Sequence, residues 1–599
     1  LVYAIFQYIL DNFRNESSDY LGFTGVVTCL VSTILILPFV HPDMGFSLYY
    51  YSWFHVVTAI GAMAGFTALS LIERKFKRKQ MRAYYYPLLI LGAGILGLIF
   101  IKILSPSLYS LIINAPSTVF GIQKGGPSTI LEASSIFYES NQYRVFTLSK
   151  VFIHFTPTGF LASVLGIFIL VANLFRKPKL QEVLLLIWSI LILLAIYGQN
   201  RFAYYYSINV SILSAYLGGL LLEKARWNEL DQKFKSNVKS LEDIPKAFKF
   251  IKVEQVLAVL VIVVFLIYPV YGSAMLYTKM QNGVPGQWVE ACDWLRSNTP
   301  DPGMNYNAIY EAPKNGEMFH YPNSTYGVMS WWDYGHYIET IGHRIPNANP
   351  FQAGVGGRRV SINETNQPGA ATFLTAPSEK EASAVLEALD PRPDKAGTRY
   401  IMSDASMATG MFISIATWTL DTEGYYQAYQ TSNGYQSIPA NRYFNSMEAR
   451  LHIFDANGMK QYRIIHETQA YQTDEVGYKQ VYNYFYGGKL PEVDTGYIKI
   501  FEYVKGANIT GTASPNETVK INTTILTNQG RTFEYSQSTT ADSQGRYEFT
   551  VPYSTDGPIA GQTQFDTAPS GPYVLRYGDT TREVRVNEEA VLKGEEIKV

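Results

Sequence analysis

The sequence has little cysteine and almost no excess of charge of either sign. Its 599 residues include two cysteines, Cys29 in an apolar run and Cys292 in a polar region, so disulfides do not define the fold. The net charge of −1 supplies no basic surface for a nucleic acid, and we expect no nucleic-acid partner. The chain also starts without methionine or a signal-like basic segment, and we expect it to be truncated at the N-terminus.

Long apolar runs are confined to the first half of the chain, so the mean hydropathy of −0.01 averages two unlike parts. Seven runs reach about 20 mainly apolar residues, the length of a helix that crosses a bilayer. Residues 1–12 have the character of the end of an earlier span. Buried helices of a soluble protein do not fit, because too little polar sequence remains to cover them. The seven runs are 21–40, 49–72, 84–104, 151–175, 181–198, 203–222 and 253–275.

Lysine and arginine gather in alternate loops between these runs. The loops after the second, fourth and sixth runs are basic, whereas 41–48, 105–150 and 199–202 hold few cations. Cytoplasmic loops are the ones enriched in lysine and arginine. The pattern therefore predicts a multi-pass cell-membrane protein with loop 105–150 and residues 276–599 outside the cell. Loop 105–150 is long for a connection between spans, which is typical of a functional loop.

The chain divides into three predicted parts, of which 1–275 is the membrane domain. Residues 276–500 mix helical and strand patterns and predict an external mixed α/β domain. Residues 501–599 alternate apolar and polar positions between turn residues, which predicts a C-terminal β-sandwich. The alternating positions are Val519, Ile521 and Thr523, then Tyr547, Phe549 and Val551.

The most distinctive string is Trp-Trp-Asp-Tyr-Gly-His at residues 331–336. Indole N–H groups only donate hydrogen bonds and an ionised aspartate only accepts them, so together they can hold a hydroxyl group. Gly335 allows a sharp turn that would expose the triplet. An aromatic core cluster with a capping aspartate explains the composition equally well.

Three further motifs carry candidate site residues. Ser-Thr-Ile-Leu-Glu at 128–132 places Glu132 in the long loop, where a carboxylate could orient a carboxamide, a poor nucleophile because of its resonance. Arg201 follows the fifth run and has the rigid fork that suits phosphate, although an arginine reaching the membrane interface gives the same pattern. Asp404, Met407 and Met411 have the spacing of one helix face, which is also typical of plain core.

These motifs resemble those of oligosaccharyltransferase catalytic subunits, called STT3 in eukaryotes, AglB in archaea and PglB in bacteria. The resemblance covers about residues 1–420 and is most like archaeal AglB. It implies a GT-C type fold of thirteen spans, of which this chain would hold the last seven. It also implies glycan transfer from a dolichyl phosphate or pyrophosphate carrier to asparagine in Asn-x-Ser/Thr sequons of acceptor proteins, by a single-subunit enzyme in contact with membrane lipid.

The resemblance assigns roles to individual residues. Glu132 would position the acceptor amide at or beside a Mn²⁺ or Mg²⁺ site, and Arg201 would hold the carrier phosphate. Further metal ligands would lie in the absent N-terminal part, so we expect the chain as given to be inactive. His336 would lie near the lipid-phosphate end of the donor, and the Trp-Trp-Asp triplet with Met407 would bind the +2 residue. The implied substrate-binding residues are Trp331, Trp332, Asp333, Met407, Thr129, Ile130 and His336.

Two alternative functions predict different sequences. A protein O-mannosyltransferase would keep the spans and an acidic loop but has no use for Trp-Trp-Asp. A transporter or envelope structural protein would carry charges within its spans, which here are largely free of charge. The chain also carries sequons of its own in the predicted external part, at Asn323, Asn363, Asn508, Asn516 and Asn522. Asn209 begins a sequon inside a span, where it should stay unmodified.

Overall fold

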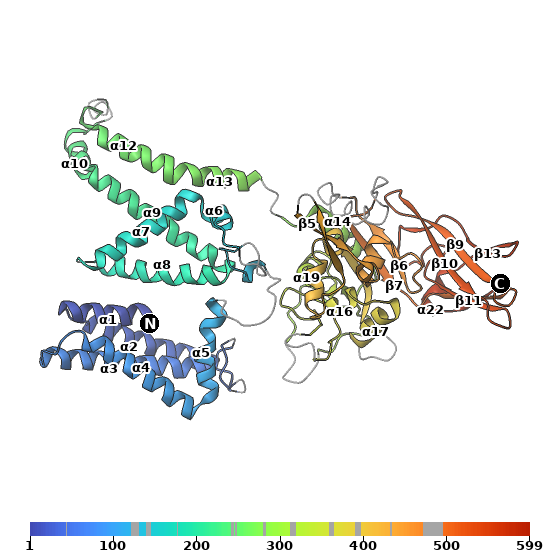
Figure 1. The fold of residues 1–599 in the computed structure, drawn as a ribbon, viewed down its shortest axis with the longest axis horizontal. Coiled ribbons are helices and arrows are strands. Elements are labelled where there is room, and N and C mark those ends of the chain that lie inside the picture. Colours follow the sequence, from blue (N-terminus) through green and yellow to red (C-terminus); the bar gives the residue numbers. More distant parts are fainter. Residues whose placement is uncertain are drawn as a thin grey trace. The chain divides into compact units, whose positions relative to one another are not determined.

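The computed structural model forms two compact units, Leu1–Asn282 and Gly283–Val599, each of which is described by itself (Figure 1). The division lies seven residues after the predicted end of the membrane domain at residue 275. The structure describes residues 1–42, 45–48, 50–120, 131–138, 145–176, 178–240, 245, 248–279, 283–311, 319–358, 364–389, 397–431, 434–470 and 495–599.

The first unit consists of helices, and seven of those in its described residues are long and apolar enough to cross a membrane. They fall on the seven predicted apolar runs, which confirms those spans. The seventh contains a π-helical turn, η7 (Ile262–Ile267), between α12 and α13. The helices are α1 (Val2–Arg14), α2 (Asp19–Ile36), α3 (Trp53–Arg78), α4 (Tyr85–Leu104), α5 (Pro106–Phe120), α6 (Ser149–Phe155), α7 (Pro157–Leu174), α8 (Leu180–Gly198), α9 (Ala203–Lys224), α10 (Trp227–Asn237), α12 (Val253–Val261) and α13 (Tyr268–Lys279).

The spans expose apolar side chains outward and use a few polar bonds between themselves. Ile103 of α4 is 73% exposed, as expected for a side chain that faces lipid. Between α8 and α9, the Nδ2 of Asn209 donates to the Oγ of Ser189 at 3.0 Å, and both side chains are fully buried. Asn209 is thus enclosed between helices, and the expectation that its sequon stays unmodified remains a prediction.

The second unit is built on a mixed five-stranded sheet with the order β2-β1-β3-β7-β6. β1 runs parallel to β2 and β3, while β7 is antiparallel to both β3 and β6. β4 (Tyr426–Thr431) and β5 (Gly434–Pro439) form a separate hairpin. The sheet strands are β1 (Gly327–Met329), β2 (Ile345–Pro346), β3 (Thr398–Asp404), β6 (Tyr462–Glu467) and β7 (Ile498–Tyr503).

Short helices pack against this sheet. α14 buries Trp288 and Leu295, and α17 buries Ala382 and Leu386, each at helical spacing along one face. The helices are α14 (Gly286–Asn298), α15 (Gly335–Thr340), α16 (Ala370–Leu374), α17 (Glu379–Leu389), α18 (Ala405–Ala408), α19 (Phe412–Thr417) and α20 (Asn441–Phe444), while α22 (Glu588–Lys593) packs on the C-terminal part of the unit.

The C-terminal residues form two further sheets that share one buried core, as expected of a β-sandwich. The six alternating positions named from the sequence, from Val519 to Val551, are all buried. One sheet has the order β10-β9-β13-β14 and the other β11-β8-β15. The strands are β8 (Ala507–Thr512), β9 (Thr518–Leu526), β10 (Thr532–Thr540), β11 (Arg546–Val551), β12 (Ala568–Pro569), β13 (Tyr573–Tyr577), β14 (Thr580–Val584) and β15 (Glu596–Lys598).

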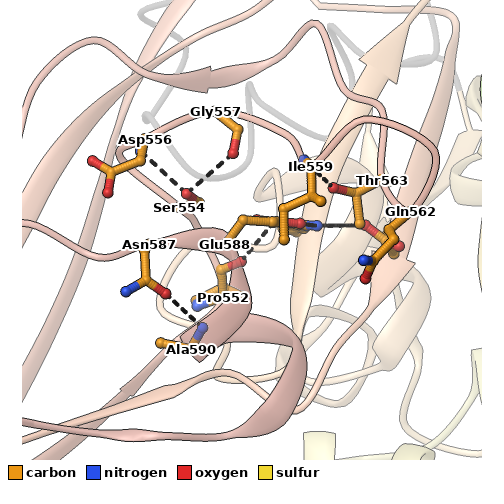
Figure 2. Close-up of polar contacts among 12 residues, drawn as sticks. Pro552, Ser554, Asp556, Gly557, Ile559, Gln562, Thr563, Asn587, Glu588 and Ala590 are labelled. Carbon is orange, nitrogen blue, oxygen red and sulfur yellow. Dashed lines mark hydrogen bonds and ion pairs between the residues drawn. The ribbon is translucent and has the colours of Figure 1, made fainter.

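The predicted boundary between residues 500 and 501 falls inside β7, which belongs to the mixed sheet. The sandwich therefore starts at β8, and a single buried cluster continues from the sheet into it. Ion pairs reinforce this junction, because Arg463 of β6 contacts both Glu502 of β7 and Glu588 of α22. The Asn587 side chain caps α22 by accepting from the N–H of Ala590 at 2.7 Å (Figure 2). The sequence pattern missed this continuity because alternation marks strands but not the sheet they join.

Candidate active site

The Trp-Trp-Asp segment lies where β1 leaves the mixed sheet. After β1 the chain passes through Trp331 in extended conformation, a 3₁₀ turn η8 (Trp332–Tyr334) and then helix α15. Gly335 has a φ of −54°, so its role is not the conformational freedom expected from the sequence. A Cβ at this position would lie 2.4 Å from the carbonyl oxygen of Ala348, so close packing requires the glycine.

The two tryptophans have different environments. Trp331 is 2% exposed and packs against Trp332 and Trp418, with ring centroids 6.2 and 6.3 Å away. Trp332 is half-buried, whereas Asp333 is exposed. The indole N–H of Trp332 is a buried donor with no hydrogen-bond acceptor among the described residues. The core interpretation therefore applies to Trp331, and Trp332 with Asp333 can meet a ligand.

The Asp404 motif differs from the expected single helix face. Asp404 is the last residue of β3 and caps α18, because its Oδ1 accepts from the N–H of Met407 at 2.7 Å. Helix α18 ends at Ala408, so Met411 lies outside it and the prediction of one continuous face is wrong. The physical reason is that Asp404 continues a buried strand and so starts the helix instead of lying within it.

The tertiary fold nevertheless brings both methionines to the Trp-Trp-Asp segment. The Oγ of Ser330 lies 3.7 Å from the Sδ of Met407, and the hydroxyl of Tyr334 donates to the Sδ of Met411 at 3.5 Å. Met407 is fully buried behind the segment. Three predicted residues, Trp331, Trp332 and Met407, thus belong to one packed cluster.

Two residues of this cluster were not predicted from the sequence as site residues. Trp288 of α14 stacks on Tyr334 with ring centroids 4.1 Å apart, and its Nε1 donates to the Oδ2 of Asp404 at 3.0 Å. Burial, followed by the charge of Asp404, raises the pKa of Tyr334 well above its usual value, so this hydroxyl stays a neutral donor. A lone tryptophan in an amphipathic helix gives no sequence signal for this support.

In the first unit, Glu132 and Arg201 lie on two adjacent 3₁₀ turns, η3 (Leu131–Ala133) and η4 (Asn200–Phe202). The N–H of Asn200 donates to the carbonyl oxygen of Ser134 at 2.7 Å, which ties the turns together. Both candidate side chains are exposed, and the Arg201 guanidinium lies 5.6 Å from the Phe202 ring centroid. The fold therefore brings these two predicted residues, far apart in the sequence, to neighbouring positions.

Three predicted substrate-binding residues remain. Thr129 and Ile130 lie outside the described residues. His336 is half-buried, with its ring 5.5 Å from that of Phe351 and its Nδ1 3.5 Å from the Glu339 carboxylate. No group of three or more metal-ligating acidic, histidine or cysteine side chains occurs in the described part of the chain.

Comparison with known proteins identifies the family. A model of the AglB core domain matches residues 285–408, and one of the long peripheral domain of archaeal glycosylation protein B matches 506–597. Dolichyl-phosphooligosaccharide-protein glycotransferase 3 of Archaeoglobus fulgidus is 33% identical over all of this chain and 74% of its own length. The chain belongs to the AglB/STT3 family of oligosaccharyltransferases.

Two solved structures extend the likeness to the whole fold. AglB from A. fulgidus, in complex with an inhibitory peptide and a dolichol-phosphate, has a TM-score of 0.82 and 31% identity. An A. fulgidus oligosaccharyltransferase in complex with zinc and sulfate has a TM-score of 0.72 and 28% identity. Each alignment covers all of this chain and 74% of the other.

Membership of the AglB family confirms the glycosyltransferase class and the fold expected from the sequence. It also confirms a multi-pass membrane protein and contradicts a transporter or an O-mannosyltransferase. The core-domain match contains the Trp-Trp-Asp segment and Met407, and the peripheral-domain match coincides with the sandwich from β8 onward.

Proposed function

We propose that this AglB-family protein transfers a glycan from a dolichyl phosphate or pyrophosphate carrier to asparagine in Asn-x-Ser/Thr sequons. The observation that carries the proposal is the buried, unpartnered indole N–H of Trp332 next to the exposed Asp333. A buried donor without an acceptor costs about 1–3 kcal/mol, so a ligand oxygen at this position would be favoured. The proposed partners are the lipid-linked oligosaccharide and acceptor proteins, and the enzyme acts as a single subunit.

The +2 hydroxyl of the sequon fits this pair of groups. A serine or threonine hydroxyl both donates and accepts, so it can accept from Trp332 and donate to Asp333. Trp331 and Met407 form the packed layer behind them. Thr129 and Ile130 are also proposed to assist substrate binding. A site built for a hydroxyl rejects an isostere that lacks one, because its polar groups are then left unpaired.

Glu132 and Arg201 carry the proposed chemistry. The Glu132 carboxylate accepts hydrogen bonds from the acceptor NH₂ and orients its nitrogen toward the first sugar's anomeric carbon. Arg201, on the adjoining turn, holds the carrier phosphate through its guanidinium fork and stabilises the charge that develops as the phosphate leaves. The His336 ring is proposed to lie near the phosphate end of the donor.

Enzymes of this family use a divalent metal, and we propose Mn²⁺ or Mg²⁺ for this protein. Glu132 is exposed on its turn and can supply one carboxylate ligand. Mg²⁺ demands about six oxygen ligands, whereas the described residues contain no group of three potential ligands. The described residues thus account for only one ligand. A bound metal would neutralise the negative charge of the leaving phosphate.

Loop 105–150 and residues 276–599 are proposed to be extracellular.

The test uses the full-length protein in membranes with lipid-linked glycan, Mn²⁺ and fluorescent peptides. We expect the Asn-x-Thr peptide to react at least about 100-fold faster than the isosteric Asn-x-Val peptide. Asp333→Ala should reduce this preference, whereas Arg201→Ala should raise the KM for the lipid donor without changing peptide preference. Equal rates for the two peptides would overturn the hydroxyl assignment, and no transfer from any lipid donor would overturn the proposed function.

A further inference from the structure

The chain's own sequons occupy different structural contexts. Asn508 and Asn522 lie in interior strands of the sandwich, each paired on both sides. Asn508 of β8 pairs with Thr550 of β11 and Glu596 of β15, and Asn522 of β9 pairs with Ser536 of β10 and Val574 of β13. To present either sequon in the folded protein, a strand would have to leave two neighbours at once.

The sequon at Asn323 is held in another way. Its +2 residue, Thr325, is 2% exposed, and its hydroxyl donates to the carbonyl oxygen of Pro322 at 2.7 Å. Asn363 lies outside the described residues. The sequon hydroxyl of Asn323 is therefore hidden in the folded protein although Asn323 itself is exposed.

The sequon Asn516-Glu517-Thr518 is different, because it forms the turn between β8 and β9. Asn516 and Thr518 are both exposed. Asn516 has a φ of 61°, in the left-handed region that asparagine tolerates, and its N–H donates to the carbonyl oxygen of Ala541 at 3.1 Å. Thr518 pairs with Thr540 at the last rung of the β9–β10 ladder. Only the end of one hairpin must open to release these three residues.

We propose that Asn516 is an N-glycosylation site of this protein, modified in the folded state by the lipid-linked oligosaccharide transfer proposed above. The Asn516 side-chain nitrogen forms a bond to the anomeric carbon, and the bond from that carbon to the carrier phosphate breaks. The amide gives up one proton to solvent water, and the carrier leaves as the phosphate anion. The proposal rests on the proposed function and on an external second unit, which places the turn on the same side as the donor.

The exposed turn also accommodates the product. A glycan on Asn516 would extend into solvent from a loop tip, whereas one on Asn522 would replace the contact of its Nδ2 with Glu534 at 3.1 Å. The fold therefore selects among chemically equivalent sequons through accessibility of both asparagine and threonine.

The experiment isolates the full-length protein from its native membranes and measures glycopeptide occupancy at each sequon by mass spectrometry. We expect most molecules to be modified at Asn516 and at least tenfold lower occupancy at Asn508 and Asn522. Asn516→Gln and Thr518→Val should abolish modification, and the matched Thr518→Ser should retain it. A Thr518→Val chain with the wild-type melting temperature establishes that loss of glycan does not reflect misfolding.

Two results would overturn the proposal. One is unmodified Asn516 in cells whose other membrane proteins carry N-glycans, which would leave the proposed function standing. The other is equal occupancy at Asn516, Asn508 and Asn522, which would mean that the fold does not select the site. If N-glycans are missing from all proteins and the peptide assay also fails, the proposed function falls together with the modification.

Discussion

The two units present their candidate residues in opposite ways. In the second unit, Trp331 of the Trp-Trp-Asp segment is buried, and the segment packs against the buried Met407 and the partly buried Tyr334. In the first unit, Glu132 and Arg201 are exposed on single 3₁₀ turns. A group packed into a framework is preorganised and costs stability when it is removed, whereas an exposed one can be changed with little effect on folding. Substitutions of the packed residues proposed to recognise the substrate are therefore expected to affect stability more than substitutions of Glu132 or Arg201.

The polar contacts buried inside the two units also differ. The second unit buries a charge network in which Asp455 contacts both Lys499 and Arg531. In the first unit, the spans α8 and α9 are joined by a neutral polar bond between Asn209 and Ser189, because a lone charge in hydrocarbon is expensive. The buried Glu73 of α3 is paired with Lys77 near the end of that helix. Buried ionised pairs of this kind are therefore a marked feature of the second unit.

The largest expected effect is on turnover in the first unit. Glu132→Gln keeps the shape of the side chain but removes the carboxylate that we propose orients the acceptor amide. We expect kcat to fall by about 10²–10⁴-fold, while the melting temperature stays unchanged because the side chain is exposed. Peptide transfer and thermal unfolding of the same full-length preparation check this. A lower melting temperature would remove the contrast between the units.

The second prediction concerns the packed tryptophan. Trp331→Ala deletes a side chain that is 2% exposed, and we expect it to cost about 3–5 kcal/mol of unfolding free energy. The matched variant Trp332→Ala removes a half-buried ring and should cost clearly less while still lowering transfer to the Asn-x-Thr peptide. Denaturant unfolding of the full-length protein in detergent compares the two. Equal losses of unfolding free energy would show that both rings act only as packed residues of the hydrophobic core.

A smaller effect is expected at the cap of α18. Asp404→Ala removes the acceptor for the Met407 N–H and leaves the Trp288 indole N–H buried without its present partner. Loss of such an acceptor costs about 1–3 kcal/mol. Because residue 404 and Trp288 would then hold the Trp-Trp-Asp segment less firmly, the KM for the Asn-x-Thr peptide should rise more than kcat falls. A changed kcat at constant KM would argue against a role of Asp404 in positioning the Trp-Trp-Asp segment.

The smallest effect is a pH dependence in the second unit. Burial raises the pKa of Glu448 to about 8, although its hydrogen bond from Ser403 favours the charged form. Because the folded protein holds this proton more tightly than the unfolded chain, stability falls as pH rises through 8. Between pH 7 and 8.5 we expect a loss of about 1 kcal/mol. Glu448→Gln should abolish this slope in denaturant titrations at each pH.

A neighbouring histidine defines the window for that measurement. Burial and the charge of Lys499 lower the pKa of His452 well below its usual value of 6.5, so its contribution rises with pH and is complete above about 6.5. The two groups oppose each other at lower pH, and only Glu448 changes between pH 7 and 8.5. A variant that keeps the wild-type slope in this window would assign the titration to another group.

The sequence by itself determined the features that depend on length, local pattern or motif. Seven spans follow from apolar length, because every buried backbone group must be satisfied within the membrane. Val519 and Phe549 lie in the sandwich core because side chains alternate along a strand. The Trp-Trp-Asp-Tyr-Gly string identified the family because its residues are contiguous.

Only the tertiary structure decided how separate segments meet. It ended α18 at Ala408 yet brought Met411 to Tyr334, and it required Gly335 for close packing instead of a turn. It also placed Trp288 against Tyr334, next to the Trp-Trp-Asp segment, and joined the Glu132 and Arg201 turns. These contacts link residues that are between 13 and 77 positions apart, so no local periodicity encodes them. Their geometry is set by how the sheet and helices pack within the second unit and how the helices and turns pack within the first.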